Sequence, residues 1–213
     1  MSDGIYVYCI IRSDGEKKSF GNMGFGGNEV YTIDYRDFSP VVSIAPVKKY
    51  EVNEEEVELH KNIVQLIMNE YSVIPVAYGM VFKNRKLITV AMSAGYKAIK
   101  KAMEAIDNKI ELGVKVIMPK DAALNGKKEE CKSEYLERLK KIAHDSKELK
   151  LFSERLILNA SFLVAKDKIN EFSGEVENLT NKYDYLRTQY SGPWPPYNFV
   201  DIHVLSKKKG GFR

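Results

Sequence analysis

The sequence has few cysteines and no long apolar run. Cys9 and Cys131 are its only two cysteines, and they lie far apart with no CxxC spacing, so a disulfide or a metal role is not expected. No window approaches the roughly 20 consecutive apolar residues that a membrane-spanning helix needs. The first residues carry no basic region ahead of a signal-like apolar run. We therefore expect a cytoplasmic protein with no membrane partner, and a free, buried thiol at Cys9, which lies in an apolar strand pattern.

Motifs that carry chemistry are also missing. The three histidines lie on different expected elements, without HExxH or zinc-finger spacing, and no serine stands in GxSxG. The glycines between residues 21 and 27 precede an expected strand rather than a helix, so a phosphate loop is not predicted. We expect no catalytic residue, cofactor or metal, and hence a protein that is not an enzyme. His60 is expected to be a partly buried histidine bonded to a backbone carbonyl.

Charge is balanced along most of the chain. Hydrophobic residues make up 44% and charged residues 29%, which is typical of an ordinary globular protein. The net charge of +4 comes with interleaved signs, as in residues 127–150, and this pattern indicates solvated surfaces. The one basic cluster near the end, at residues 207–209, predicts a basic flexible tail over residues 207–213. No nucleic-acid partner is expected.

The first part of the chain mixes strand and helix patterns. An unbroken run of Ile, Tyr, Val and Cys at residues 5–11 predicts a central strand. Asn53 with Glu56 resembles a capping box and predicts a helix over about residues 53–69. Further strands are expected at residues 30–35, 41–44, 73–82 and 110–118, with a second helix before the last of them. The order favours an α+β domain of ferredoxin-like type over residues 1–119.

A second, smaller α+β domain is expected over residues 120–206. The Asn125-Gly126 turn marks the boundary, and a charged helix is predicted to follow over residues 129–150. Asp167 is a candidate cap for a later helix. Strands are expected at residues 156–165, 185–190 and 198–204.

The most unusual segment, residues 191–199, reads SGPWPPYNF and holds the only tryptophan. Each proline fixes its own φ and biases the preceding residue toward extended geometry, so the aromatic residues are presented with little entropy left to lose. Two interpretations stay open. The segment is either a rigid crossover whose aromatic side chains fill the core, which we rank first, or a recognition surface anchored by Trp194.

These residues resemble a known family. SGPWPPYNF is similar to the Gly-Pro-Trp-Pro-Pro-Tyr signature of the gas vesicle F/L proteins, and residues 74–82 resemble the central block of that family. Ala77 and Met80 stand where the family has Arg and Thr, so no role of that arginine carries over. Similarity in residues 4–8, 37–42 and 111–115 extends the resemblance over almost the whole chain.

The resemblance implies an accessory or minor structural protein of gas vesicles. Such proteins are thought to bind the small apolar shell protein, limit its aggregation during nucleation and remain in some cases at the gas-facing surface. It implies the shell protein and other accessory proteins as partners. The contact candidates are Trp194, Pro195, Pro196 and Tyr197, followed by Pro75, Tyr78 and Phe82.

Two alternatives from other classes remain. A small RNA-binding ferredoxin-like module would stack bases on sheet aromatics, but no RNP-type run is present. An enzyme acting through the glycine-rich loop and His60 would need a cleft with convergent polar groups.

Overall fold

The computed structural model describes residues 2–119 and 127–200. It forms two compact units, which we call unit 1 (Met1–Asp107 with the segment from Phe199) and unit 2 (Asn108–Asn198). Both combine helices with antiparallel strands, so the predicted α+β class is confirmed. Each unit is described by itself.

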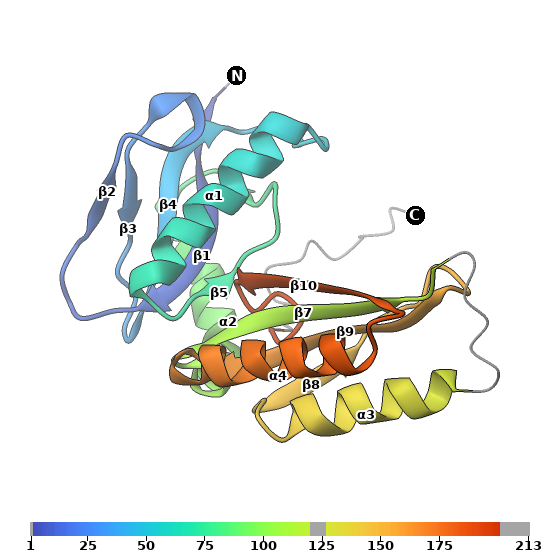
Figure 1. Ribbon diagram of the computed structural model, residues 1–213. Coiled ribbons are helices and arrows are strands. Elements are labelled where there is room, and N and C mark those ends of the chain that lie inside the picture. Colours follow the sequence, from blue (N-terminus) through green and yellow to red (C-terminus); the bar gives the residue numbers. More distant parts are fainter. Residues whose placement is uncertain (1, 120–126, 201–213) are drawn as a thin grey trace, which may run out of the picture. The chain divides into compact units, whose positions relative to one another are not determined.

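Unit 1 is built around one antiparallel sheet with strand order β2-β3-β4-β1-β5, and β6 also pairs with β1 (Figure 1). Two long helices follow the first four strands in sequence. Its elements are β1 (Asp3–Arg12), β2 (Ser19–Gly21), a short 3-10 turn η1 (Phe25–Gly27), β3 (Val30–Thr32), β4 (Phe38–Pro46), α1 (Glu54–Glu70), β5 (Ile74–Pro75), β6 (Val81–Phe82) and α2 (Arg85–Ile106).

β1 is the central strand of unit 1, as its apolar run predicts. It pairs with β4 on one side and with β5 and β6 on the other. Residues 6–11 are all buried, which means that both faces of the strand are covered, since successive side chains point to opposite faces. The loop between β5 and β6 is tied to this strand, because the Val7 N–H donates to the carbonyl of Met80 at 2.9 Å.

α1 begins at the predicted cap. The side chain of Asn53 accepts a hydrogen bond from the Glu56 N–H at 3.0 Å, which satisfies one of the free donors at the start of a helix. Three glutamates in its first turn complement the positive end of the helix dipole. The buried side of α1, which includes His60, Val64 and Ile67, faces the sheet.

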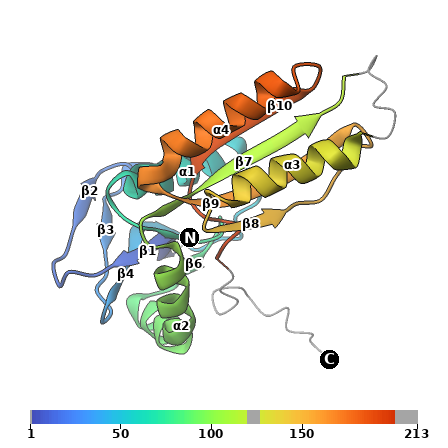
Figure 2. The same ribbon diagram turned by 60° about the horizontal axis from the view of Figure 1, so that its bottom comes forward.

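Unit 2 has the order β-α-β-β-α-β, with strand order β10-β7-β9-β8 and every neighbouring pair antiparallel. This is the ferredoxin-like arrangement. Its helices α3 and α4 lie on the same face of the sheet (Figure 2). The elements are β7 (Lys109–Ile117), α3 (Lys128–Lys140), β8 (Asp145–Glu148), β9 (Leu156–Ala165), a 3-10 turn η2 (Lys166–Lys168), α4 (Ile169–Lys182) and β10 (Arg187–Trp194).

The division between units differs from the predicted one. The chain divides after residue 107 rather than after residue 119, because β7 pairs along its length with β9 and β10. The ferredoxin-like order assigned to residues 1–119 is therefore found in unit 2, and unit 1 has a different strand order. The error arises because β7 finds its partners far downstream, which local sequence patterns do not reveal.

Three local predictions for unit 2 are also wrong. The helix expected over residues 129–150 ends at Lys140, and the polar strand β8 follows it. Asp167 forms no capping hydrogen bond, since α4 begins only at Ile169 after the short η2 turn. The strand expected at residues 185–190 is β10, which extends to Trp194 and includes Pro193. Proline has no N–H to donate, and it is tolerated here because β10 lies at the edge of the sheet.

Several predictions fall on other parts of the chain. The Asn125-Gly126 turn, His203 and the tail 207–213 lie outside the described residues, as does most of the strand expected at 198–204, whose first residues form a turn. Within residues 2–119 and 127–200, no helix is long and apolar enough to cross a membrane.

Candidate functional site

The Trp-Pro-Pro-Tyr segment forms the end of β10 and the turn after it, in unit 2. Trp194 is the last residue of β10 and is 48% exposed, and Tyr197 is also exposed. Pro195 and Pro196 between them are buried. The Tyr197 N–H donates to the carbonyl of Pro195 at 2.7 Å, which closes the turn. The interpretation that we ranked first is therefore wrong in one respect, since the aromatic rings of Trp194 and Tyr197 reach the surface and only the prolines between them are buried. A recognition surface anchored by Trp194 stays a prediction.

A buried carboxylate holds this turn in place. Glu111 of β7 is 5% exposed, and it accepts hydrogen bonds from the backbone N–H of Asn198 at 2.9 Å and from the Ser161 hydroxyl at 2.8 Å. The side-chain amide of Asn198 donates to the same carboxylate and to Ser161. Trp194 pairs with Glu111 across the two strands. Strand pairing with Glu111 thus holds the turn at Trp194, and the side chain of the same residue holds it at Asn198.

Beside the turn lies a groove of about 220 Å³ on the face of the sheet opposite α3 and α4. Successive side chains of a strand point to opposite faces of the sheet. Leu112, Val114 and Val116 of β7 are buried on the face that the helices cover, so the residues between them lie on the face with the groove. Residues that line the groove include Glu111, Gly113, Lys115, Asn159, Gln189 and Trp194.

The floor of the groove depends on Gly113. Ser191 of β10 lies directly across from it, and a Cβ atom at Gly113 would come within 2.7 Å of the Ser191 hydroxyl oxygen. That hydroxyl also accepts a hydrogen bond from the Trp194 indole N–H at 3.3 Å. Next along β7, the ammonium group of Lys115 lies 5.6 Å from the ring centre of Phe152, an exposed aromatic residue.

The arrangement suits binding rather than proton transfer. An exposed indole lies beside amide, hydroxyl and ammonium groups, so the groove offers one large apolar surface together with several hydrogen-bonding groups. β10 is an edge strand, because β7 is its one partner among the described strands of this sheet. In the described parts of the chain, no group of three His, Cys, Asp or Glu side chains is placed to hold a metal ion.

The second set of candidates lies in unit 1 and is half buried. Pro75 in β5 pairs with Cys9 of β1, and Phe82 in β6 pairs with Ile5 of β1. The hydroxyl of Tyr78 in the loop between them donates to Glu56 at 2.7 Å and reaches the carbonyl of Glu51 at 3.1 Å. Burial and this carboxylate raise the pKa of Tyr78 to about 12. The structure thus places the two sets of candidates in different units, and the second set is engaged in internal contacts.

His60 contacts a backbone carbonyl, as predicted, but it is fully rather than partly buried. It is 2% exposed, and its Nε2 lies 3.1 Å from the carbonyl oxygen of Val76. Burial lowers the pKa of His60 to about 4, so the ring is neutral at pH 7. Tyr6 and Tyr8 of β1 pack beside the ring. The interior position leaves the imidazole out of reach of a substrate.

Sequence reasoning missed Glu111, Gly113, Ser161 and Asn198. Two signals for them existed in the strand at residues 109–117. An acidic residue among buried apolar neighbours indicates a fixed hydrogen-bond acceptor, and a glycine inside a strand indicates a close approach by another group.

Comparisons with known proteins agree on one family. The model of the family "Gas vesicle synthesis protein GvpL/GvpF" matches residues 4–134 and 120–201. Gas vesicle protein F1 of Halobacterium salinarum is 33% identical over the whole length of both chains. Gas vesicle protein F of Haloferax mediterranei is 34% identical, covering 99% of this chain and all of the relative.

Solved structures share the fold. The crystal structure of gas vesicle protein GvpF from Anabaena sp. PCC7120 superposes with a TM-score of 0.84 at 21% identity, covering 94% of this chain and 99% of that chain. The GvpF structure from Microcystis aeruginosa gives a TM-score of 0.80 at 18% identity, covering 93% and 99%.

Proposed function

The chain belongs to the GvpL/GvpF family of gas vesicle synthesis proteins, and we propose that it assists gas vesicle assembly by binding the small apolar shell protein through the Trp-Pro-Pro-Tyr turn. In this role it limits aggregation of the shell protein during nucleation. The proposed place of action is the cytoplasm and the forming gas vesicle. Other accessory proteins of the vesicle are proposed partners as well.

The physical need for such a partner is plain. A shell that excludes water presents an apolar inner face, and before assembly that face is exposed and prone to aggregate. A partner can cover it by offering a groove or a free strand edge, which requires complementary shape rather than catalytic groups. We therefore propose that the protein is not an enzyme.

The observation that carries the proposal is the half-exposed indole of Trp194 on a rigid support. Its strand pairs with β7, the next two residues are buried prolines, and Glu111 fixes the end of the turn at Asn198. A large apolar group that is already ordered loses little entropy on binding, so more of its burial appears as affinity. Aromatic side chains in such positions are common binding hot spots.

The edge of β10 supports the same location. A strand of the shell protein added beside residues 187–192 of β10 would continue the sheet of unit 2 and lie close to Trp194. Tyr197 then forms the far wall of the contact. Pro75, Tyr78 and Phe82 remain second candidates in unit 1, where their internal contacts leave less surface to offer.

The test is co-expression with the shell protein of the same organism, measuring how much shell protein stays soluble and co-purifies. We expect wild type to retain it and Trp194→Ala to lose most of it. Tyr185→Ala is the matched control, because Tyr185 is 43% exposed in the same unit and lies outside the groove.

Two results would count against the proposal. Equal retention by wild type and Trp194→Ala would remove the turn from the contact. No retention by a folded wild type would remove the shell protein as partner. Salt-dependent binding to RNA in that second case would support the RNA-binding alternative.

A further inference from the structure

α2 of unit 1 carries an excess of basic residues. Between residues 83 and 106 there are six Lys or Arg residues and one acidic residue, Glu104, whereas the whole chain has a net charge of only +4. All six basic residues are exposed: Lys83, Arg85, Lys86, Lys97, Lys100 and Lys101. This helix and the two residues before it thus carry six basic residues against one acidic residue.

These basic side chains have no acidic partners among the described residues. The ion pairs found there involve other parts of the chain. α3 shows the contrast, since Lys132, Arg138 and Lys141 each pair with a glutamate. Lys97, Lys100 and Lys101 lie within about one turn of one another, so their like charges repel, a cost that an acidic partner would relieve.

The outer face of α2 also exposes apolar side chains. Its buried residues Ile88, Met92 and Ile99 face the core of unit 1. Residues two positions later lie on the opposite face, because each residue advances the helix by about 100°. There Val90 is 57% exposed and Leu87 is 42% exposed. The two side chains are three residues apart, so they lie next to each other on the helix surface.

We propose that this outer face binds an acidic amphipathic helix of a partner protein. We call it the α2 basic face and define it by Lys86, Leu87, Val90, Ala94, Lys97 and Lys101. It extends over about 22 Å at 1.5 Å per residue, or roughly four turns. Glutamates of the partner meet the three lysines, and its apolar stripe covers Leu87 and Val90. The small side chain of Ala94 lets the two helices approach closely.

Other classes of occupant fit this face less well. Single-stranded RNA stacks its bases on aromatic side chains, and the α2 basic face has none. Phosphate groups would also leave its aliphatic side chains without an apolar contact. A helix lying in a membrane surface buries its apolar face in lipid, but the main apolar face of α2 is already packed in unit 1. Charge together with exposed aliphatic residues favours a protein helix.

The test uses a fluorescein-labelled amphipathic peptide with Glu and Leu on adjoining faces, and it measures fluorescence anisotropy. We expect salt-sensitive binding by wild type and a loss of about tenfold in affinity for Lys97→Glu/Lys101→Glu, and a smaller loss for Val90→Asn. The charge-reversed variant should instead bind a peptide in which Lys replaces Glu. The control is Lys140→Glu/Lys150→Glu, which alters two exposed lysines in unit 2.

Several outcomes would overturn the proposal. Unchanged peptide binding by the folded charge-reversed variant would exclude the α2 basic face. Tighter binding to a single-stranded RNA probe or to phosphatidylserine vesicles than to the peptide, unaffected by Val90→Asn, would make the occupant a nucleic acid or a membrane. If the wild-type protein self-associates and the Lys97→Glu/Lys101→Glu variant does not, the occupant of the α2 basic face is a second copy of this chain. None of these results touches the Trp194 test, which concerns unit 2.

Discussion

The hydroxyl of Tyr6 donates a hydrogen bond to Nδ1 of His60, at 3.0 Å, in the core of unit 1. The direction follows from the other ring nitrogen, because Nε2 faces the Val76 carbonyl, which only accepts, and must itself carry the hydrogen. Tyr6 also accepts from the Gly79 N–H at 2.8 Å. A neutral His60 therefore ties α1 to β1 and to the loop after β5.

The first prediction concerns acid stability. The pKa of His60 is lowered to about 4 in the folded protein from its ordinary value of 6.5, so the unfolded chain binds a proton first as pH falls. The stability that the neutral His60 contributes is therefore fully present above pH 6.5. Between pH 6.5 and 4 the free energy of unfolding falls by about 3 kcal/mol. His60→Gln removes the titration, and urea unfolding at several pH values should show a shallower slope for that variant. His144→Gln, at an exposed histidine, should keep the wild-type slope.

The second prediction concerns the carboxylate under the turn. Glu111→Gln replaces one acceptor oxygen by a donor facing Asn198 and should lower the free energy of unfolding by about 1–3 kcal/mol, with a larger loss for Glu111→Ala. Trp194 is the only tryptophan, so urea unfolding followed by its fluorescence reports this turn directly. Glu137→Gln, at an exposed glutamate of α3, is the control and should stay within about 0.5 kcal/mol of wild type. A stable Glu111→Ala with unchanged fluorescence would refute the anchoring role.

The third prediction compares two glycines of unit 2. Gly192 has a φ of +116°, and a Cβ atom there would lie 2.9 Å from the Glu111 carbonyl oxygen. Gly192→Ala should therefore cost about 1–3 kcal/mol of stability. Gly174, inside α4, has open space where a Cβ would be, so Gly174→Ala should stabilise by about 0.5–1 kcal/mol. The melting temperatures of the two variants test this prediction. A change of the same sign in both would contradict the structure.

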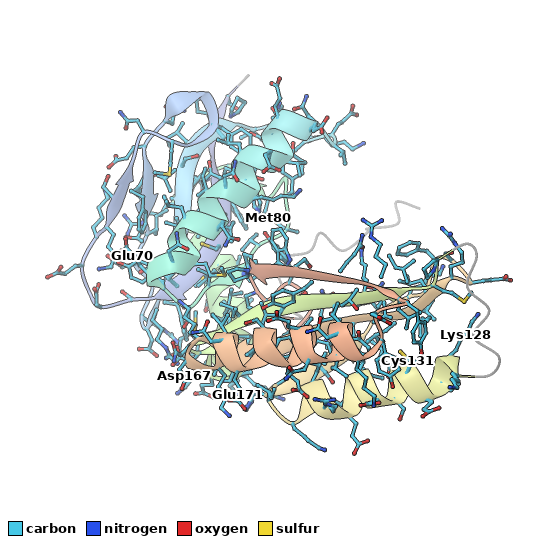
Figure 3. All side chains as sticks on the ribbon, viewed as in Figure 1. Glu70, Met80, Lys128, Cys131, Asp167 and Glu171 are labelled. Carbon is cyan, nitrogen blue, oxygen red and sulfur yellow. The ribbon has the colours of Figure 1, made fainter. Side chains whose placement is uncertain are left out.

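The fourth prediction uses one buried cysteine in each unit. Cys9 lies in β1 and Cys131 on α3 (Figure 3), and burial raises the pKa of both thiols, that of Cys131 to about 11. Neither should react with a thiol reagent in the native protein. Glu111→Ala should speed labelling of Cys131 alone, and His60→Gln that of Cys9 alone, as identified by mass spectrometry of peptides. Joint labelling in either variant would mean that the two units open together.

Local patterns predicted the elements whose signals are complete within a few residues. The run of Ile, Tyr and Val in β1 indicates a strand buried on both faces, and Asn53 with Glu56 indicates where α1 begins. β8 was missed because an edge strand of Asp, Ser, Lys and Glu carries no apolar alternation. The division between units was misplaced because β7 looks the same in sequence whichever sheet it joins.

The candidate site was predicted only at its exposed end. Proline and tryptophan in one short segment mark a rigid, unusual turn, whereas its support comes from a carboxylate some eighty residues earlier in the chain, across two strand pairings. Hydrogen bonds between side chains so far apart leave no local pattern. Glu111 becomes recognisable only when β7 is known to lie between β9 and β10.

The place of β10 in its sheet also sets an order of events during translation. A chain emerging from the ribosome exposes β7 first, yet one edge of that strand stays unpaired until residues 187–194 have been made. The carboxylate of Glu111 likewise cannot accept its hydrogen bond from the Asn198 N–H until that residue has been made. A nascent chain that is stopped before this point cannot form the tryptophan turn, so the partner binding that we propose for this turn requires a complete sheet of unit 2.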